Sequence, residues 1–438
     1  MRNQIAAVAA VLLSATSAQA AGFLLNTQGA KGTGRAHAYV ADPKDASAIF
    51  HNVGAIGRLK GTQLYIGGSL IAPDQTYDGP EGFTEMQVSI VPTAHFYATS
   101  QVVPGITVGL GVNSPYGSGL EWGPDSPGRQ LVREISLRTF YITPSVGVDL
   151  DTLGVPGLSF GGGIDFVPAS AYLRQDILFS ADEVAQAELS GNDLAFGARA
   201  GFVYNPPFAP DAHLGVSYRL PVAFNFSGQG DFDSPDYLRD QLPVDGDGSV
   251  ELELPSNLKI GFAYDFTQNL QVEVNAHFDG WSTYDNLILN LPPNPDGSEN
   301  DPTVLRRDWE DTWSFRIGGE YAEEEWAIRA GYEYDPTPVP DDTLDFTLVD
   351  VDRNVLTAGG SFLLSDNIAV DASFWYLFPR TRVPGPEPFN PPFKGEYEVS
   401  AFVATVGLSF TLDGASAIDG TKLVGETVPA GQATAAPQ

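Results

Sequence analysis

The amino-acid sequence predicts an all-β fold, an antiparallel transmembrane β-barrel of about 14 strands. Three observations support this prediction. Apolar and polar residues alternate over about ten residues at a time, and about fourteen such segments lie between Thr62 and Phe410. The gaps between these segments are alternately short and long, as in the hairpins of outer-membrane barrels.

The alternation is clearest in residues 270–280, 312–321 and 326–334. In the first of these, LQVEVNAHFDG, every even-numbered residue from 270 to 278 is apolar and every odd-numbered residue to 279 is polar. Successive side chains of a strand point to opposite faces, so a period of two indicates β-strands with one apolar and one polar face. A soluble sandwich would show the same pattern, so the alternation alone does not decide between the two folds.

The lengths of the gaps between these segments favour the barrel over the soluble sandwich. Short gaps lie near residues 101–104, 151–156, 206–211, 267–269, 322–325 and 365–367, and long gaps near 73–84, 119–134, 180–191, 229–248, 291–303, 336–351 and 383–394. Outer-membrane barrels have short periplasmic turns and long external loops. Aromatic residues near strand ends fit the girdles of such a barrel: Trp122, Trp281, Trp309, Trp326, Tyr334 and Phe378.

The first residues have the features of a targeting segment. Arg2 provides a positive charge, Ile5 to Leu13 are apolar, and Ala18-Gln19-Ala20 is a small-residue cleavage site. We therefore expect residues 1–20 to be a signal peptide. After Leu13 no apolar run reaches the roughly 18 residues of a membrane helix.

Composition excludes several classes of function. The chain has 55 acidic and 23 basic residues, a net charge of −32, and no cysteine. This balance argues against nucleic acid as a partner, and disulfides and thiolate metal sites are impossible. The histidines show no metal-ligand spacing. We expect neither a metal nor a cofactor.

The last strand predicts how the barrel ends. Residues 402–410, FVATVGLSF, alternate and close on Phe410, which resembles the assembly signal of outer-membrane proteins and implies the barrel assembly machinery as a partner. We expect the barrel to span residues 61–411. Residues 412–438 lack periodicity and predict a flexible periplasmic tail.

Nearly the whole chain resembles the outer-membrane long-chain fatty acid transporters (FadL), including their toluene-transporter relatives. The resemblance rests on GAKGTGRAHAYVADPKDASAIFHN (29–52), VGLGVNSPYGSGLEW (108–122) and WAIRAGYEYDPTPVPD (326–341). It implies a bacterial outer-membrane protein that passively carries hydrophobic small molecules, either long-chain fatty acids or neutral hydrocarbons. Lateral release into outer-membrane lipid and a monomeric state are also expected.

The resemblance also implies that residues 21–60 form a hatch that plugs the lumen of the barrel. Gly29, Gly32 and Gly34 would permit tight backbone in a crowded interior. The family's Asn-Pro-Ala is altered here, because Val53 and Gly54 follow the asparagine. A barrel of this width would leave an open hole without a plug.

Candidate functional residues come from the same resemblance. Phe23 matches a hatch residue in the family's inner pocket, with a packing role as the alternative. The segment Asn113, Ser114, Pro115, Tyr116 and Gly117 matches the inward kink and lateral opening of the third strand. Proline cannot donate to a strand ladder, so Pro115 either kinks the strand or ends it.

Basic residues bear on the charge of the substrate. A buried carboxylate head group needs a cationic partner, and one of the family's basic positions aligns with Ser170 here. Arg316 and Arg329 are the other candidates for substrate binding, but Glu320 and Glu333 are close to them on the same strand faces. These observations favour neutral hydrocarbons at least as much as fatty acids.

Two other functions are alternatives to transport. One is an outer-membrane barrel hydrolase, although the sequence shows no convincing set of nucleophile and base. The other is a structural or adhesive barrel.

Overall fold

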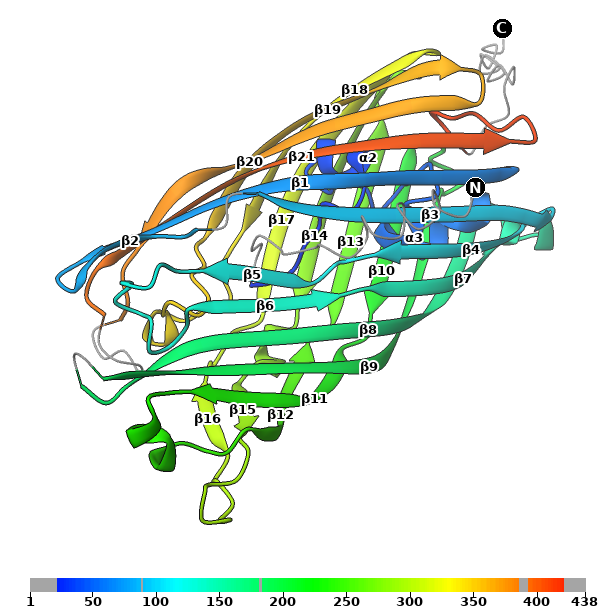
Figure 1. Cartoon of the computed structure of the whole chain (residues 1–438). Helices are drawn as coiled ribbons and strands as arrows, with labels where there is room; N and C mark the ends of the chain where they lie inside the picture. Colours follow the sequence, from blue (N-terminus) through cyan, green and yellow to red (C-terminus); the bar gives the residue numbers. More distant parts are fainter. Residues whose placement is uncertain (1–21, 88–89, 181–182, 386–392, 421–438) are drawn as a thin grey trace, which may run out of the picture.

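The computed structural model describes residues 22–87, 90–180, 183–385 and 393–420. The predicted signal peptide and residues 421–438 of the predicted tail lie outside this part of the chain. Figure 1 shows strands wound into one closed barrel around the N-terminal residues. No helix among the described residues has the length and apolarity needed to cross a membrane.

Fourteen antiparallel strands form the wall, as predicted. β21 pairs with β1 from Leu412 opposite Thr62 to Glu396 opposite Asp78, which closes the barrel. Several strands are divided into two labelled parts, and β2 (Gly82–Glu85) extends the hairpin that begins in β1. The wall consists of β1 (Thr62–Gly79), β3 (Val91–Val103), β4 (Ile106–Asn113) with β5 (Gly117–Glu121), β6 (Glu134–Thr139) with β7 (Tyr141–Asp149), β8 (Leu158–Leu178), β9 (Val184–Tyr204), β10 (Ala212–Arg219) with β11 (Val222–Asp233), β12 (Gly246–Leu254) with β13 (Asn257–Asp265), β14 (Leu270–Asp279) with β15 (Asn286–Asn290), β16 (Thr303–Arg306) with β17 (Thr312–Ala322), β18 (Trp326–Asp335), β19 (Arg353–Ser365), β20 (Ile368–Arg382) and β21 (Glu396–Leu412).

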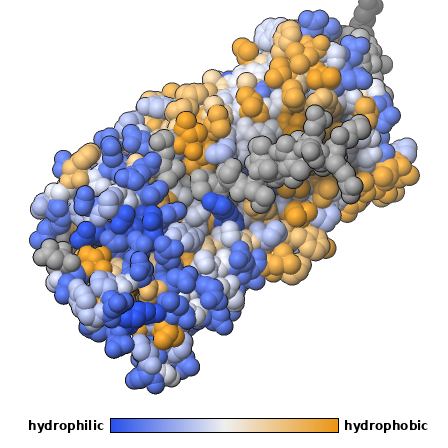
Figure 2. Space-filling view, in the orientation of Figure 1, coloured by the Kyte–Doolittle hydropathy of each residue, from blue (hydrophilic) through white to orange (hydrophobic). Residues whose placement is uncertain are grey.

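Burial along the strands is the reverse of that in a soluble protein. In β14 the apolar Val274 is 46% exposed, whereas the neighbouring Glu273 is 0% exposed. Apolar side chains therefore face outward and polar ones face the lumen, as the alternation predicted for a barrel in lipid. Figure 2 shows that apolar residues gather over one part of the outer surface and hydrophilic residues over the opposite end.

The short turns lie where they were predicted, but strands extend into some of the predicted long loops. The predicted loop at residues 73–84 is wrong for most of its length, because β1 continues to Gly79 and β2 begins at Gly82. The predicted loop at residues 180–191 is wrong from Val184 onward, because β9 begins there. β8 and β9 are both 21 residues long, about twice what a transmembrane strand needs. Their far ends pair with each other, and the far end of β9 also pairs with β11.

Short helices connect the wall strands to one another. They are η2 (Leu150–Leu153) at a short turn, and η3 (Asp236–Gln241) and η5 (Asp341–Thr343) in long connections, whereas η4 (Trp281–Thr283) lies between the two parts of one wall strand, β14 and β15. The N-terminal segment contains three others: α2 (Ala30–Gly34), α3 (Ala48–His51) and η1 (Val53–Arg58).

The N-terminal segment, residues 22–60, lies within the barrel (Figure 1). Residues 22 to 59 are all buried except Lys44 and Arg58, which are half-buried. The Glu273 carboxylate of β14 accepts the backbone N–H groups of Val40 and Ala41 at 2.6 and 2.9 Å. These bonds fix irregular backbone against the polar inner wall, which supplies the partners that buried peptide groups require.

The altered residues after Asn52 fit their surroundings closely. The Asn52 side chain accepts the Gly54 N–H at 3.0 Å and donates to the carbonyls of Val40 and Phe202. A Cβ at Gly54 would lie 2.5 Å from the backbone of Gly201. Glycine therefore allows η1 to approach the wall at β9 more closely than any other residue would.

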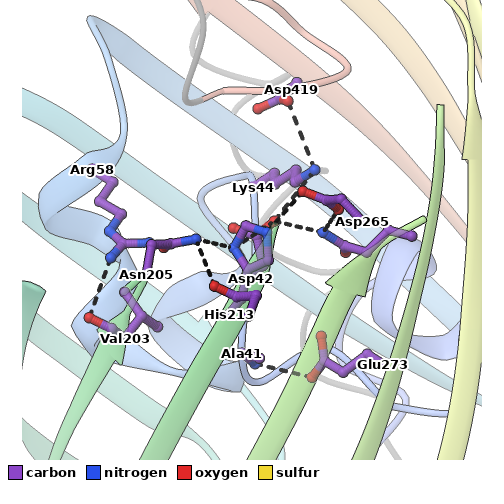
Figure 3. Close-up of polar contacts among 12 residues, drawn as sticks. Ala41, Asp42, Lys44, Arg58, Val203, Asn205, His213, Asp265, Glu273 and Asp419 are labelled. Carbon is purple, nitrogen blue, oxygen red and sulfur yellow. Dashed lines mark hydrogen bonds and ion pairs between the residues drawn. The ribbon is translucent and has the colours of Figure 1, made fainter. Parts of the chain in front are cut away.

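Polar contacts join the N-terminal segment to the wall and to the chain after the last strand (Figure 3). Lys44 lies 3.3 Å from Asp42 and 3.9 Å from Asp419. His213 of β10 lies 3.7 Å from Asp42 and contacts Asp265 of β13 at 2.8 Å. Burial acts to lower the pKa of Lys44, but the Asp42 and Asp419 carboxylates outweigh burial, so this pKa lies above its ordinary value.

The chain after the last strand departs from the predicted flexible tail. Residues 413–420, here called the C-terminal segment, turn back over the barrel end, and Ala415, Ala417 and Ile418 are buried. Lys31 of α2 donates to the carbonyls of Ala417 and Ile418 at 3.3 and 3.2 Å. The prediction failed here because the partners of this segment lie hundreds of residues away in the sequence.

Gly420 completes these contacts. Its N–H donates to the Lys44 carbonyl at 2.7 Å, and its own carbonyl accepts the Lys60 N–H at 2.9 Å and the Gln63 side chain at 2.7 Å. The C-terminal segment is thus hydrogen-bonded both to the start and to the end of the stretch that fills the lumen.

Truncation after Leu412 is expected to loosen the N-terminal segment. Hydrogen bonds to a charged group such as Lys31 contribute about 1.5–3 kcal/mol each, so amides of residues 30–60 should exchange roughly tenfold faster or more. Hydrogen exchange read by mass spectrometry measures this. Truncation after Gly420 is the matched control and should leave exchange unchanged. Equal exchange in both truncations would contradict a clamping role.

Candidate functional site

An apolar cavity lies inside the barrel between the N-terminal segment and the long loops. It encloses about 940 Å³ of space that protein atoms leave empty, part of it open to solvent. Its walls come from β6, β8, β9, β11, β12 and β15. The apolar side chains of these walls include Leu137, Leu173, Leu189, Phe226, Leu287 and Leu289. Such a concave, mostly apolar space is typical of a site for a hydrophobic ligand.

Phe23, for which the family resemblance implies a role in substrate binding, lies in the wall of this cavity. Its ring contacts Trp281, Tyr284, Trp309 and Tyr116 at centroid distances of 4.8, 5.6, 5.6 and 6.3 Å. Aromatic pairs at these distances add to the burial energy of each ring. Through Tyr116, this aromatic cluster joins the N-terminal segment to residues 113–117.

The residue before Phe23 explains how the chain reaches this position. Gly22 has φ +63°, and a Cβ there would lie 2.6 Å from the ring of Trp309. The Gly22 N–H donates to the Asp350 carboxylate at 3.1 Å. Only glycine combines this left-handed backbone with so close an approach to an aromatic ring.

Three of the predicted girdle residues belong instead to the interior. Trp122, Trp281 and Trp309 are 0%, 0% and 4% exposed, so their assignment to the lipid interface is wrong. They lie in loops and in η4, where strand alternation no longer tells inside from outside. Trp326 and Phe378 are exposed on the wall, as a girdle requires.

Arg307 is a functional candidate that sequence reasoning missed. It lines the cavity just after β16 and donates to the Asp345 carboxylate at 3.1 Å. Burial acts to lower its pKa, but Asp345 and Tyr284 outweigh burial and raise that pKa above its ordinary value. Burial also raises the pKa of the Tyr284 hydroxyl, against the opposing effect of Arg307. The paired arginines of LRRDWEDTW were visible in the sequence, but nothing there shows which one points inward.

The other predicted substrate-binding residues lie away from this cavity. Ser170 of β8 alternates with the inner residues Ala169 and Ala171 and is absent from the cavity wall. Arg316 pairs with Glu333 at 2.8 Å, and Arg329 pairs with Glu320. None of the three lines the cavity, and both arginines already have carboxylate partners.

The predicted lateral gate, residues 113–117, leaves the wall and turns into the lumen. All five of its residues are buried. Gly117 N–H donates to the Phe23 carbonyl at 3.0 Å, and Leu25 N–H donates to the Pro115 carbonyl at 2.7 Å. The segment therefore pairs with the N-terminal segment instead of with its neighbour in the wall.

The register of the neighbouring wall strands shows which strand pairs are missing beside residues 113–117. On one side Phe96 of β3 lies opposite Val112, and on the other Met86 forms a bridge with Trp122. Both pairs would belong to one continuous antiparallel ladder. An uninterrupted ladder would place Pro115 opposite Thr93 and Gly117 opposite Val91. Between the described residues 90–95 and 113–118 no such ladder pair exists, which leaves an opening in the hydrogen-bonded wall.

The described residues contain no group of three or more histidines and carboxylates suited to hold a metal ion.

Comparison with known proteins gives one family. The family described as "Outer membrane protein transport protein (OMPP1/FadL/TodX)" matches residues 11–412. The "Long-chain fatty acid transport protein" of Escherichia coli O6:H1 is 25% identical over 414 residues, covering 84% of this chain and 89% of the relative. The "47 kDa outer membrane protein" of Pasteurella multocida is 24% identical over 401 residues, covering 86% and 91%.

Solved structures show the same fold. A Pseudomonas aeruginosa FadL homologue superposes with a TM-score of 0.77 at 20% identity, covering 89% of this chain and 100% of the other. The Pseudomonas putida toluene transporter TodX gives a TM-score of 0.73 at 17% identity, covering 89% and 99%.

Proposed function

Because the chain belongs to the OMPP1/FadL/TodX family of outer-membrane transport proteins, we propose that it carries long-chain fatty acids or neutral hydrocarbons passively through the outer membrane. The predicted location and transport class agree with the family. A family of transporters favours this function over the hydrolase and the adhesive barrel. The observation that carries the proposal is an apolar cavity bordered by Phe23, next to an opening in the wall.

The route begins at the long loops and ends in the lipid. A hydrophobic molecule enters the cavity from outside and contacts Phe23 at its inner end. Residues 22–60 act as the hatch that blocks the direct path to the periplasm. The molecule leaves sideways between β3 and residues 113–117, so it never has to cross the polar lumen. This route needs no cofactor, because the molecule moves down its own gradient.

The backbone bonds between Phe23–Leu25 and Pro115–Gly117 connect the cavity with the lateral opening. The same strand residues would pair with β3 if the N-terminal residues moved away, since the register on both sides is continuous. The N-terminal segment therefore keeps the opening from closing. The chain closes its own barrel through β1 and β21, which supports insertion by the barrel assembly machinery and work as a monomer in outer-membrane lipid.

Replacing Phe23 with alanine is expected to weaken ligand binding about tenfold. A buried phenylalanine contributes about 1.5–3 kcal/mol of apolar burial, and 1.4 kcal/mol corresponds to a tenfold change in affinity. Equilibrium binding of a labelled hydrocarbon and a labelled fatty acid to the purified protein measures the effect. Phe208→Ala is the matched control, because Phe208 is 86% exposed at a short turn. Equal losses in the two variants would refute the cavity as the binding site.

A further inference from the structure

The polar end of the cavity contains one cation whose charge is already balanced. Among the described residues that line the cavity, Arg307 is the only one with a charged side chain. Its Nη1 donates to Asp345 at 3.1 Å, and the two side chains are 6% and 2% exposed. The cavity wall together with this buried carboxylate therefore has no net charge.

Asp345 is held in this position by its own loop. The Thr347 N–H donates to its Oδ1 at 2.7 Å, and Thr347 also lines the cavity. The neighbouring Phe346 is 0% exposed and packs against the rings of Tyr77 and Trp122 at 4.7 and 5.2 Å. The carboxylate consequently cannot swing away to release Arg307 without lifting a buried aromatic residue.

One donor of Arg307 remains unused. Its Nε–H is buried and has no hydrogen-bond partner among the residues that the structure describes. A buried unpaired donor is costly. Arg307 lines the cavity, so a small turn of its guanidinium group on ligand binding would bring this donor to an acceptor on the ligand. A carboxylate ligand would meet Arg307 and Asp345 together. The carboxylate would lose its hydration on entering the cavity, and the Arg307–Asp345 pair offers no net positive charge to compensate for that loss.

We propose that the Arg307–Asp345 pair sets the substrate class of this cavity: uncharged, mainly apolar molecules that carry a hydrogen-bond acceptor, in preference to carboxylates. This inference rests on the proposed function and names the molecules that the same cavity selects. Arg307 donates one hydrogen bond to the acceptor, and Asp345 cancels the charge that would otherwise attract an anion.

The test exploits a predicted gain of affinity. Three probes of equal chain length are compared by equilibrium binding to the purified protein: a linear alkane, its methyl ketone and its carboxylate. In wild type the ketone should bind most tightly. Asp345→Asn removes the balancing charge with little change of shape, so the carboxylate should bind roughly tenfold more tightly, while the alkane is unchanged.

Arg307→Met removes the cation instead of its carboxylate partner. The ketone should lose roughly tenfold in affinity and become equal to the alkane. In the double variant Arg307→Met/Asp345→Asn, which leaves no unpaired buried charge, the gain for the carboxylate should vanish. Alkane binding in each variant verifies that the cavity is intact.

Two results would overturn the inference. If wild type binds the carboxylate most tightly, or if Asp345→Asn leaves the order of the three probes unchanged, the pair does not set the substrate class. If wild type binds none of the three probes, the proposed function itself fails, and the inference fails with it.

Discussion

Deletion of residues 21–60 is expected to turn a tight barrel into a water-filled pore. The wall needs none of these residues for closure, because β1 pairs with β21 from Thr62 to Asp78 and the other strands pair with their neighbours except at the opening beside residues 113–117. The inner wall is polar, with Gln271, Glu273 and Asn275 facing the space that the segment fills. Removing the segment leaves a hydrophilic channel in a barrel of this strand number.

Conductance in a planar bilayer measures this effect, which should be a change from almost none to a steady open channel. Truncation after Gly420 is a suitable control, because it leaves the N-terminal segment and the C-terminal segment intact. The deleted protein must still show the heat-sensitive gel mobility of a folded barrel. A folded deletion variant that conducts no more than wild type would show that residues 21–60 do not plug the lumen.

Closing the lateral opening is expected to abolish transport without unfolding the barrel. Pro115→Val restores a backbone donor, and Gly117→Val adds a residue that favours strand structure. In the continuous register these residues would lie opposite Thr93 and Val91, so the ladder between β3 and β4 would extend across the gap. Hydrocarbon uptake should then fall to the level of cells that lack the protein.

Proline replacement elsewhere in the wall is the control for this prediction. Pro144 lies in β7 opposite Leu110, away from the opening, and Pro144→Val should leave uptake unchanged. Normal uptake by a folded Pro115→Val/Gly117→Val protein would mean that molecules leave by another path.

The barrel wall could be predicted because the alternation of apolar and polar residues is visible within each strand by itself. Alternation in residues 270–279 indicates which side chains face the lumen without reference to any partner. The strand count and the short turns follow from repeated local patterns of this kind. The overlong hairpin of β8 and β9 was missed, since polar residues such as Gln186 and Glu188 are as common in loops as in strands that leave the membrane.

The interior was less predictable, because its contacts join residues far apart in the chain. Lys31 is hydrogen-bonded to Ala417 and Ile418, and Arg307 to Asp345. The residues adjacent to each member of these pairs in the sequence do not indicate its partner. Phe23 and residues 113–117 were proposed as functional residues from the family resemblance, and their mutual hydrogen bonds are evident only from the fold.

Reversible closure of the opening tests lateral release most directly. The chain has no cysteine, so Val91→Cys/Gly117→Cys would introduce a single pair, placed opposite each other in the closed register. The measurement is uptake of a labelled hydrocarbon by the same cells before oxidation, after oxidation and after reduction. Our account predicts that uptake is lost when the disulfide forms and returns when it is reduced. Unchanged uptake through the cross-linked barrel would contradict it.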